Sequence, residues 1–260
     1  MILKNKIVEE YLSNISFFSE LDQTERNILY KSTTIKHYAK RHSLFIQGDT
    51  VEKFLVVVQG WIKLYNVTDG GEEIFIDMLP PGHVLGASAI FSAKTYPFSA
   101  SIAEDVVLAE IPIDVIERRV WANQALARQV MAIMTQKINH LWIENGHLST
   151  MTGEQLLSCL LLRLSSWMTG NGGTFSLPYD KSIIAAQLGV ELSTLSRLFA
   201  KMKTKGVDCK GSEVKVADFS ALSACCCPQC PISKEQCAGR RSPMKSAFIM
   251  DFEDDLKKAS

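Results

Sequence analysis

The segment 182–199 constrains the fold more than any other, because its pattern fits two short helices that cross closely. Ala185 supplies a small residue where such helices would touch, and Gly189, four residues later, can take the positive φ of a sharp turn. Apolar residues stand where a shared core would lie: Ile184, Leu188, Val190, Leu195 and Leu198. The spacing predicts a helix-turn-helix.

The second of these helices would carry a polar face. Ser193, Ser196 and Arg197 fall on the side opposite the apolar residues, which is the side that a recognition helix turns to the major groove of DNA. We expect Arg197 to read a base, since its planar fork pairs with guanine O6 and N7. Ser193 and Ser196 either contact a phosphate or base edge, or serve as capping or solvent-facing residues.

Local charge favours the same partner. The chain has 28 Lys and Arg against 28 Asp and Glu, so nucleic-acid binding has to rest on a basic patch rather than on net charge. Between Lys181 and Lys215 there are seven basic residues and three acids, a patch able to release counterions from phosphates. We assign Lys201 of this patch to DNA. Residues 207–216, turning at 210–212, predict a two-stranded wing.

Residues 34–111 have the sequence pattern of a small antiparallel β-domain. Short β-rich runs alternate with turn signals; the runs are 54–58, 61–65 and 73–76, and the turn signals are 48–49, 59–60, 69–71 and 80–82. A sandwich or roll follows from this alternation. Helical spacing precedes it at 6–31, where Asp22 opens a second short helix.

A long helix is predicted after the β-domain, because residues 113–145 contain neither Gly nor Pro. Apolar residues lie close to a heptad-like stripe: Leu126, Val130, Met134, Ile138 and Leu141. When the apolar stripe of a long helix extends beyond the domain that the helix belongs to, it usually packs against the same helix of a second copy of the chain. The alternative is a helix packed only on its own roll.

The order and spacing of these features resemble the CRP/FNR family over about residues 10–220. The resemblance is carried by these segments: Gly48-Asp49, Phe54 to Gly60, Pro81 to Gly86, the long helix, and Leu195-Ser196-Arg197. It implies an α+β fold with a cyclic-nucleotide-binding-like β-roll, a dimerisation helix and a C-terminal winged helix-turn-helix. The expected division is a β-roll sensor domain at 1–118, a dimerisation helix at 119–150, a winged helix-turn-helix DNA-binding domain at 151–218 and a cysteine-rich tail at 219–260.

The expected function is transcription regulation by a cytoplasmic homodimer, with double-stranded DNA and RNA polymerase as partners. The first residues lack the apolar core of a signal peptide, and the longest uncharged run, 78–93, is interrupted by prolines and glycines, so no membrane is expected. Because no nucleophile elbow, phosphate loop or pair of catalytic carboxylates is found, an enzyme is not expected.

Two departures from the family concern ligands. Members that bind cyclic AMP hold it with a Gly-Glu and an Arg-Ser pair, whereas here Gly86 precedes Ala87 and the second position reads Tyr96-Pro97. The ligand's polar groups would be buried unpaired, so cyclic AMP is not expected. FNR-like members commonly read DNA with Glu, Ser and Arg. Ser193 replaces that Glu, so the half-site should differ at one base pair.

The seven cysteines are concentrated near the C-terminus, with five of them between 225 and 237. Cys227, Cys230 and Cys237 form a C-x2-C-x6-C pattern, which in a reducing cytosol favours a metal or redox site over disulfides. Clustered thiolates suit an iron–sulfur cluster or zinc, and a thiol–disulfide switch or a tail without a cofactor also fits. Cys159 and Cys209 are interpreted as small hydrophobes.

The position of this cluster resembles the Bacillus-type FNR, which has three cysteines after the winged helix and a non-cysteine fourth ligand. The resemblance implies a 4Fe-4S cluster, sensitive to oxygen or nitric oxide, on Cys227, Cys230 and Cys237. Cys225 or Cys226 is the candidate fourth ligand here. The rival hypothesis is a regulator of the same fold that senses a small organic effector in the roll, with zinc or a thiol switch on the cysteines.

The histidines show no spacing typical of metal ligands. His83 is expected on a solvated loop of the roll. His140 and His147 are expected on the surface or in the dimer seam.

Overall fold

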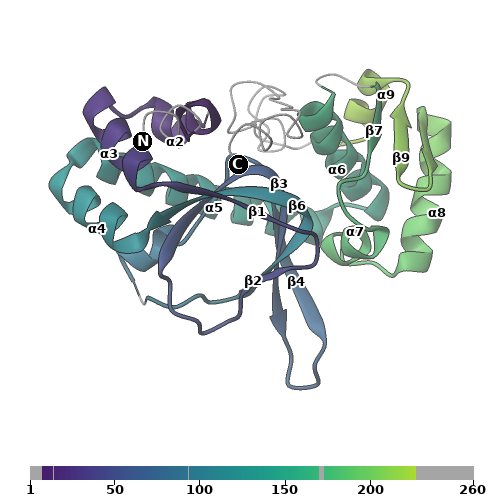
Figure 1. The fold of residues 1–260 in the computed structure, drawn as a ribbon. Coiled ribbons are helices and arrows are strands. Elements are labelled where there is room, and N and C mark those ends of the chain that lie inside the picture. Colours follow the sequence, from purple (N-terminus) through teal and green to yellow (C-terminus); the bar gives the residue numbers. More distant parts are fainter. Residues whose placement is uncertain (1–7, 14, 93, 170–172, 227–260) are drawn as a thin grey trace.

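The structure, a computed structural model, describes residues 8–13, 15–92, 94–169 and 173–226. These residues form two hydrophobic cores, one inside a β-roll and one inside a helical unit near the C-terminus. Figure 1 shows the roll in the middle of the molecule, with short helices on one side and the helical unit on the other.

The roll is an antiparallel sheet in the order β1-β6-β3-β4, with β2 paired to β6 and β5 paired to β3. Its strands are β1 (Thr34–Tyr38), β2 (Ser43–Phe45), β3 (Lys53–Val67), β4 (Glu73–Leu79), β5 (Val84–Leu85) and β6 (Ser99–Pro112). The helices beside them are α2 (Ser16–Ser19), α3 (Gln23–Ser32), the 3-10 helix η1 (Ala87–Ile90) and α4 (Ile113–Ala122). The predicted β-roll is confirmed.

Asp22 begins α3 as predicted. Its carboxylate accepts a hydrogen bond from the Glu25 backbone N–H at 2.9 Å, which satisfies one of the free donors of the first turn. The Glu25 side chain is buried and forms an ion pair with Arg119, whose Nε donates to it at 3.1 Å. Glu25, whose backbone is capped by Asp22, therefore attaches α3 to α4 through its side chain.

The turn predicted at Gln59-Gly60 is wrong, because β3 runs through it. The pairing of β3 with β6 shifts register on both sides of Gly60. Gly60 has a φ of +80°, and a Cβ there would lie 2.1 Å from the Asp105 carbonyl oxygen. Glycine thus permits a bulge with close approach of two backbones, not a chain reversal. The next residue, Trp61, packs in the second core.

The long helix is α5 (Gln124–Thr150). At its N-terminal end, Leu126 and Val130 are fully buried against the roll. Further along, apolar side chains remain exposed: Ile138, Leu141, Trp142 and Leu148. Trp142 keeps 70% of its surface accessible. The predicted stripe is therefore divided, since its first part serves the roll and its second part is uncovered in the described chain.

The helical unit gathers four helices and a three-stranded sheet in the order β7-β9-β8. Its elements are α6 (Gly153–Met168), β7 (Gly173–Ser176), α7 (Lys181–Gln187), α8 (Leu192–Met202), the 3-10 helix η2 (Lys203–Lys205), β8 (Val207–Lys210), β9 (Glu213–Val216) and α9 (Phe219–Ala224). The predicted wing is β8 and β9. Strand β7, which no sequence pattern predicted, pairs with β9 along its whole length.

The two units share a hydrophobic contact. The second core includes three roll residues, Trp61, Met78 and Ala103. The Trp61 ring lies 5.2 Å from the ring of Trp167 on α6 and 5.5 Å from that of Tyr179, measured between centroids. Aromatic pairs at such distances contribute a stabilisation beyond that of the apolar area that they bury. The contact fixes the helical unit against β3 and β4.

In the described chain, each helix taken alone falls short of the length and apolarity required to cross a bilayer. Only α7 and α8 counted together, as a bent pair, pass that test.

Gly60→Ala is expected to lower the free energy of unfolding by about 3 kcal/mol, because a Cβ meets the β6 backbone and also requires a strained φ. Gly71→Ala is the matched control, since Gly71 has a φ of +83° but nothing within 4 Å of a Cβ. That variant should lose only about 1 kcal/mol. Urea unfolding followed by tryptophan fluorescence compares the two, and equal losses would contradict the close approach.

Candidate nucleic-acid interface

Helices α7 and α8 cross at the angle that a helix-turn-helix requires. Their axes bend by 94° at the short connection between them. In that connection Gly189 has a φ of +65° with nothing within 4 Å of a Cβ, so the turn needs glycine for its backbone conformation alone. Ala185 is buried where the helices meet, and its carbonyl accepts from the Val190 N–H at 3.0 Å. The predicted helix-turn-helix is confirmed.

Helix α8 has one apolar and one polar face. Its buried side chains are Leu195, Leu198, Phe199 and Met202. Its exposed side chains include the four predicted DNA contacts, Ser193, Ser196, Arg197 and Lys201. The structure therefore brings these four residues together on one exposed face of one helix.

The hydroxyl of Ser196 is engaged within α8. Its Oγ donates to the Leu192 carbonyl oxygen at 3.0 Å. In this rotamer the proton is used by the helix, and the oxygen lone pairs remain available as acceptors. A base amino group is then a better partner for Ser196 than a phosphate oxygen.

Lys201 is held by an acid from another helix. Its Nζ lies 2.8 Å from Glu154 Oε1 at the start of α6, while Lys205 Nζ lies 3.1 Å from Glu154 Oε2. The hydrogen bonds from Lys201 and Lys205 lower the pKa of Glu154, and the hydrogen bond to Glu154 raises the pKa of Lys205. Both lysines are therefore partly neutralised in this conformation.

The rest of the basic patch divides into paired and unpaired cations. Lys203 and Lys210 approach Asp208 at 3.6 and 3.9 Å. Within the residues that the structure describes, Arg197 and Lys215 form no ion pair and are exposed. Arg197 thus offers a guanidinium that no acid has to release before it can reach a base.

The first cysteines of the tail lie at the end of α9. Cys226 is partly buried against the second core, and its Sγ donates to the Leu222 carbonyl oxygen at 3.4 Å. The hydrogen bond to Glu154 raises the pKa of Lys205, burial opposes this rise, and the charge of the Cys225 side chain adds to it. Cys227, Cys230 and Cys237 lie outside the described residues. Within the described part of residues 8–226, there is no group of three or more His, Cys, Asp or Glu side chains that could hold a metal ion.

Cys159 and Cys209 form no disulfide among the described residues, and both are partly buried. Cys209 lies in the wing, where its Sγ is 3.6 Å from the Gly211 carbonyl oxygen. Cys159 lies within α6.

The expectation of a solvated His83 is wrong. The backbone of His83 is fixed to β3, because its carbonyl accepts from the Val57 N–H at 2.9 Å. His83 is half-buried with its Nδ1 shielded from solvent, and burial together with the charge of Lys137 lowers its pKa to about 4. Burial also lowers the pKa of His140 on α5. The only sequence feature that indicates the position of His83 is the Pro80-Pro81-Gly82 turn, which directs His83 toward β3.

Comparisons with known proteins agree with this geometry. Residues 35–120 match the cyclic nucleotide-binding domain, and residues 156–225 match the Crp-like helix-turn-helix domain. The transcriptional activator protein FnrA of Stutzerimonas stutzeri is 30% identical over 189 residues, which cover 71% of this chain and 77% of FnrA. The anaerobic regulatory protein of Pasteurella multocida is 28% identical over 207 residues, which cover 78% of this chain and 74% of that protein.

Among solved structures, FixK2 from Bradyrhizobium japonicum has a TM-score of 0.68 at 19% identity, with 75% of this chain and 98% of FixK2 covered. At that identity the likeness concerns the fold. The chain belongs to the CRP/FNR family and is a DNA-binding transcription regulator of the FNR/CRP type.

Proposed function

We propose that this regulator binds a two-fold symmetric DNA site as a homodimer, with Ser193, Ser196, Arg197 and Lys201 of each copy in the major groove. The observation that supports this most directly is the exposed polar face of α8, whose other face is buried. In this reading the chain divides into a roll sensor at 1–118, a dimerisation helix at 119–150, a DNA-binding domain at 151–218 and a tail at 219–260. RNA polymerase would be the partner of the DNA-bound dimer.

The uncovered part of α5 supports the homodimer. Ile138 and Leu141 are each 45% exposed, and Trp142 is 70% exposed. A stripe of apolar side chains on a long helix is stabilised when a copy of the same helix covers it. Two DNA-binding units related by that two-fold axis would reach half-sites about one helical turn apart.

Arg197→Lys is expected to weaken binding to the preferred palindrome about ten- to a hundredfold, because lysine cannot pair with guanine through two parallel hydrogen bonds. Binding to unrelated DNA should change little. The palindrome is first selected from random-sequence DNA, and fluorescence anisotropy then gives both affinities. The matched control is Arg118→Lys on α4, an exposed arginine that pairs with Asp114 at 2.8 Å. Equal losses on both DNAs would show that Arg197 contacts only phosphate.

Glu154→Gln is expected to strengthen DNA binding several-fold at low salt, since Lys201 and Lys205 are released from their carboxylate. The dependence of log affinity on log salt should steepen by about one, the effect of one further phosphate contact. Glu117→Gln is the control, because it breaks a similar pair with Lys94, 2.7 Å long, on the roll. An unchanged salt dependence would exclude Lys201 from the DNA contact.

We also propose that Cys227, Cys230 and Cys237 hold a 4Fe-4S cluster, with Cys225 or Cys226 as the candidate fourth ligand. The donor set fits, because clustered thiolates are the usual ligands of such clusters. The described thiols of Cys225 and Cys226 lie together at the end of α9. When bound, the cluster would supply a group that oxygen or nitric oxide destroys. The similarity to an anaerobic regulatory protein supports a redox signal.

Protein purified without air is expected to contain iron and acid-labile sulfide, about four of each per chain. Cys230→Ala should lose both, whereas Cys159→Ala, which removes a cysteine of α6, should retain them. Gel shifts under nitrogen and after exposure to air then test whether DNA affinity follows the cluster. Zinc in place of iron, or no metal at all, would contradict the cluster and leave the DNA-binding proposal intact.

The second candidate is a regulator that senses a small organic effector in the roll, with zinc or a thiol switch on the cysteines. An open cleft of about 410 Å³ favours it, since this volume suits a small ligand. Its acids include Asp49, Glu52 and Glu110, with Lys53 bound to Glu110 at 2.7 Å. These carboxylates would repel a phosphate, which agrees with the absence of cyclic AMP from our proposal. Colourless, zinc-containing protein that a neutral or cationic metabolite stabilises would favour this candidate.

A further inference from the structure

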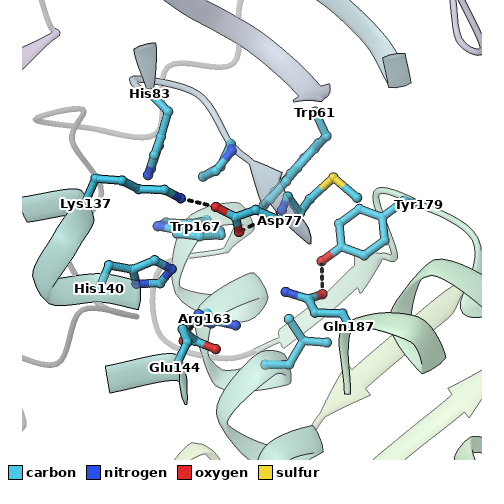
Figure 2. Close-up of a pocket in the computed structure, with 13 residues that line it drawn as sticks. Trp61, Asp77, His83, Lys137, His140, Glu144, Arg163, Trp167, Tyr179 and Gln187 are labelled. Carbon is cyan, nitrogen blue, oxygen red and sulfur yellow. Dashed lines mark hydrogen bonds and ion pairs between the residues drawn. The ribbon is translucent and has the colours of Figure 1, made fainter. Parts of the chain in front are cut away.

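A cavity of about 60 Å³ lies where the roll, α5 and the DNA-binding unit meet (Figure 2). The roll contributes Asp77 and His83, and α5 contributes Lys137 and Glu144. Arg163 and Trp167 come from α6. All three parts of the chain therefore supply walls to one space.

The charged groups in the walls are paired with one another. Lys137 forms an ion pair with Asp77, and Arg163 Nη1 lies 2.6 Å from Glu144 Oε1. Each pair joins α5 to a different unit, because Asp77 lies on β4 and Arg163 on α6. Each cation in the walls is thus paired with one carboxylate. The kind of ligand that the cavity can hold therefore depends on the atoms that these pairs leave without a partner.

Three nitrogen atoms of the cavity walls are buried without a hydrogen-bond partner: His83 Nδ1, Arg163 Nε and Trp167 Nε1. An arginine Nε–H and an indole N–H are donors only. Buried donors are nearly always satisfied in folded proteins, by protein, water or ligand. Whatever fills this cavity must therefore accept hydrogen bonds from Arg163 and Trp167, which excludes metal ions and ammonium groups.

Charges of both signs act on the groups that line the cavity, and Glu144 is the charge that acts most strongly on His140. Lys137 is the charge that acts most strongly on His83, ahead of Asp77. Arg163 is the charge that acts most strongly on Tyr179, which lies across the cavity in Figure 2, ahead of Asp77 and Glu144. The choice of ligand therefore rests on the unpartnered donors, which form stronger hydrogen bonds with an anionic acceptor than with a neutral acceptor of the same size.

We propose that this junction binds a small carboxylate or inorganic oxyanion, held by the N–H groups of Arg163 and Trp167 and by His83. The volume is several times the ~10–15 Å³ that one water requires, and it admits an anion of roughly three to five non-hydrogen atoms. The bound anion would touch the roll and α6 together. It would therefore stabilise the arrangement in which the DNA-binding unit is docked on the roll.

The test uses the full chain labelled with nitrogen-15 and follows the indole N–H resonances of its tryptophans by NMR. Sodium formate, acetate and nitrate are titrated in turn, with sodium chloride at the same ionic strength as reference. At least one of the three is expected to shift the Trp167 resonance in a saturable way. The resonance of Trp142, which is exposed on α5, should change no more than it does in chloride.

Two variants test the assigned donors by the rise in melting temperature that the active anion causes. Arg163→Lys keeps a positive charge for Glu144 but removes the Nε–H, and Trp167→Phe keeps an aromatic ring without the N–H. Each should weaken binding about tenfold, the usual effect of losing one hydrogen bond to a charged group. The control Arg118→Lys should bind as the unchanged protein does.

The proposal is overturned if none of the three anions gives a saturable shift, which would mean that water alone fills the cavity. It is also overturned if chloride shifts Trp167 equally, or if Arg163→Lys and Trp167→Phe retain full affinity. Because no step involves DNA or the cysteines, failure here leaves the proposals on DNA reading and on the cluster untouched.

Discussion

The position of the DNA-binding unit depends on the packing of Trp61 against Trp167 and Tyr179. Trp61 belongs to a roll strand, yet it lies in the core of the other unit because β3 bulges at Gly60. The same bulge requires the β6 backbone to approach more closely than any side chain would allow. One glycine therefore determines both the geometry of the sheet and the surface on which α6 rests.

That contact is reinforced by polar links with weaker individual effects. Lys40 approaches Asp180, the residue before α7, at 3.3 Å, and Lys137 pairs with Asp77. The first pair is exposed, so it contributes little in solvent. The second is buried enough to be costly when broken. A signal that changes the angle of α8 has to loosen the aromatic contact and this inner pair together, which favours two discrete arrangements over gradual movement.

Local patterns could be predicted from the sequence, and contacts between distant segments could not. The Gly189 turn, the wing and the Asp22 cap each depend on residues within a few positions, so spacing alone was sufficient. At Gly60 the same local signal, a glycine after a polar residue, was misleading because the close approach of Asp105 decided the outcome. His83 was misplaced for a similar reason, since its burial depends on α5 and α6. The exposed face of α8 was correctly located, whereas the pairing of Lys201 with Glu154 needed the fold.

The pairing of Lys201 also suggests how the tail can affect DNA. The charge of Cys225 acts on Lys205, Lys205 pairs with Glu154, and Glu154 pairs with Lys201 on the recognition helix. A thiol that becomes a metal ligand gives up its proton and carries negative charge. Beside Cys225 such a charge would compete with Glu154 for Lys205, and Glu154 would then hold Lys201 alone. If Cys225 is a ligand of the proposed cluster, the charge presented to phosphates would therefore change through these neighbouring side chains without any movement of α8.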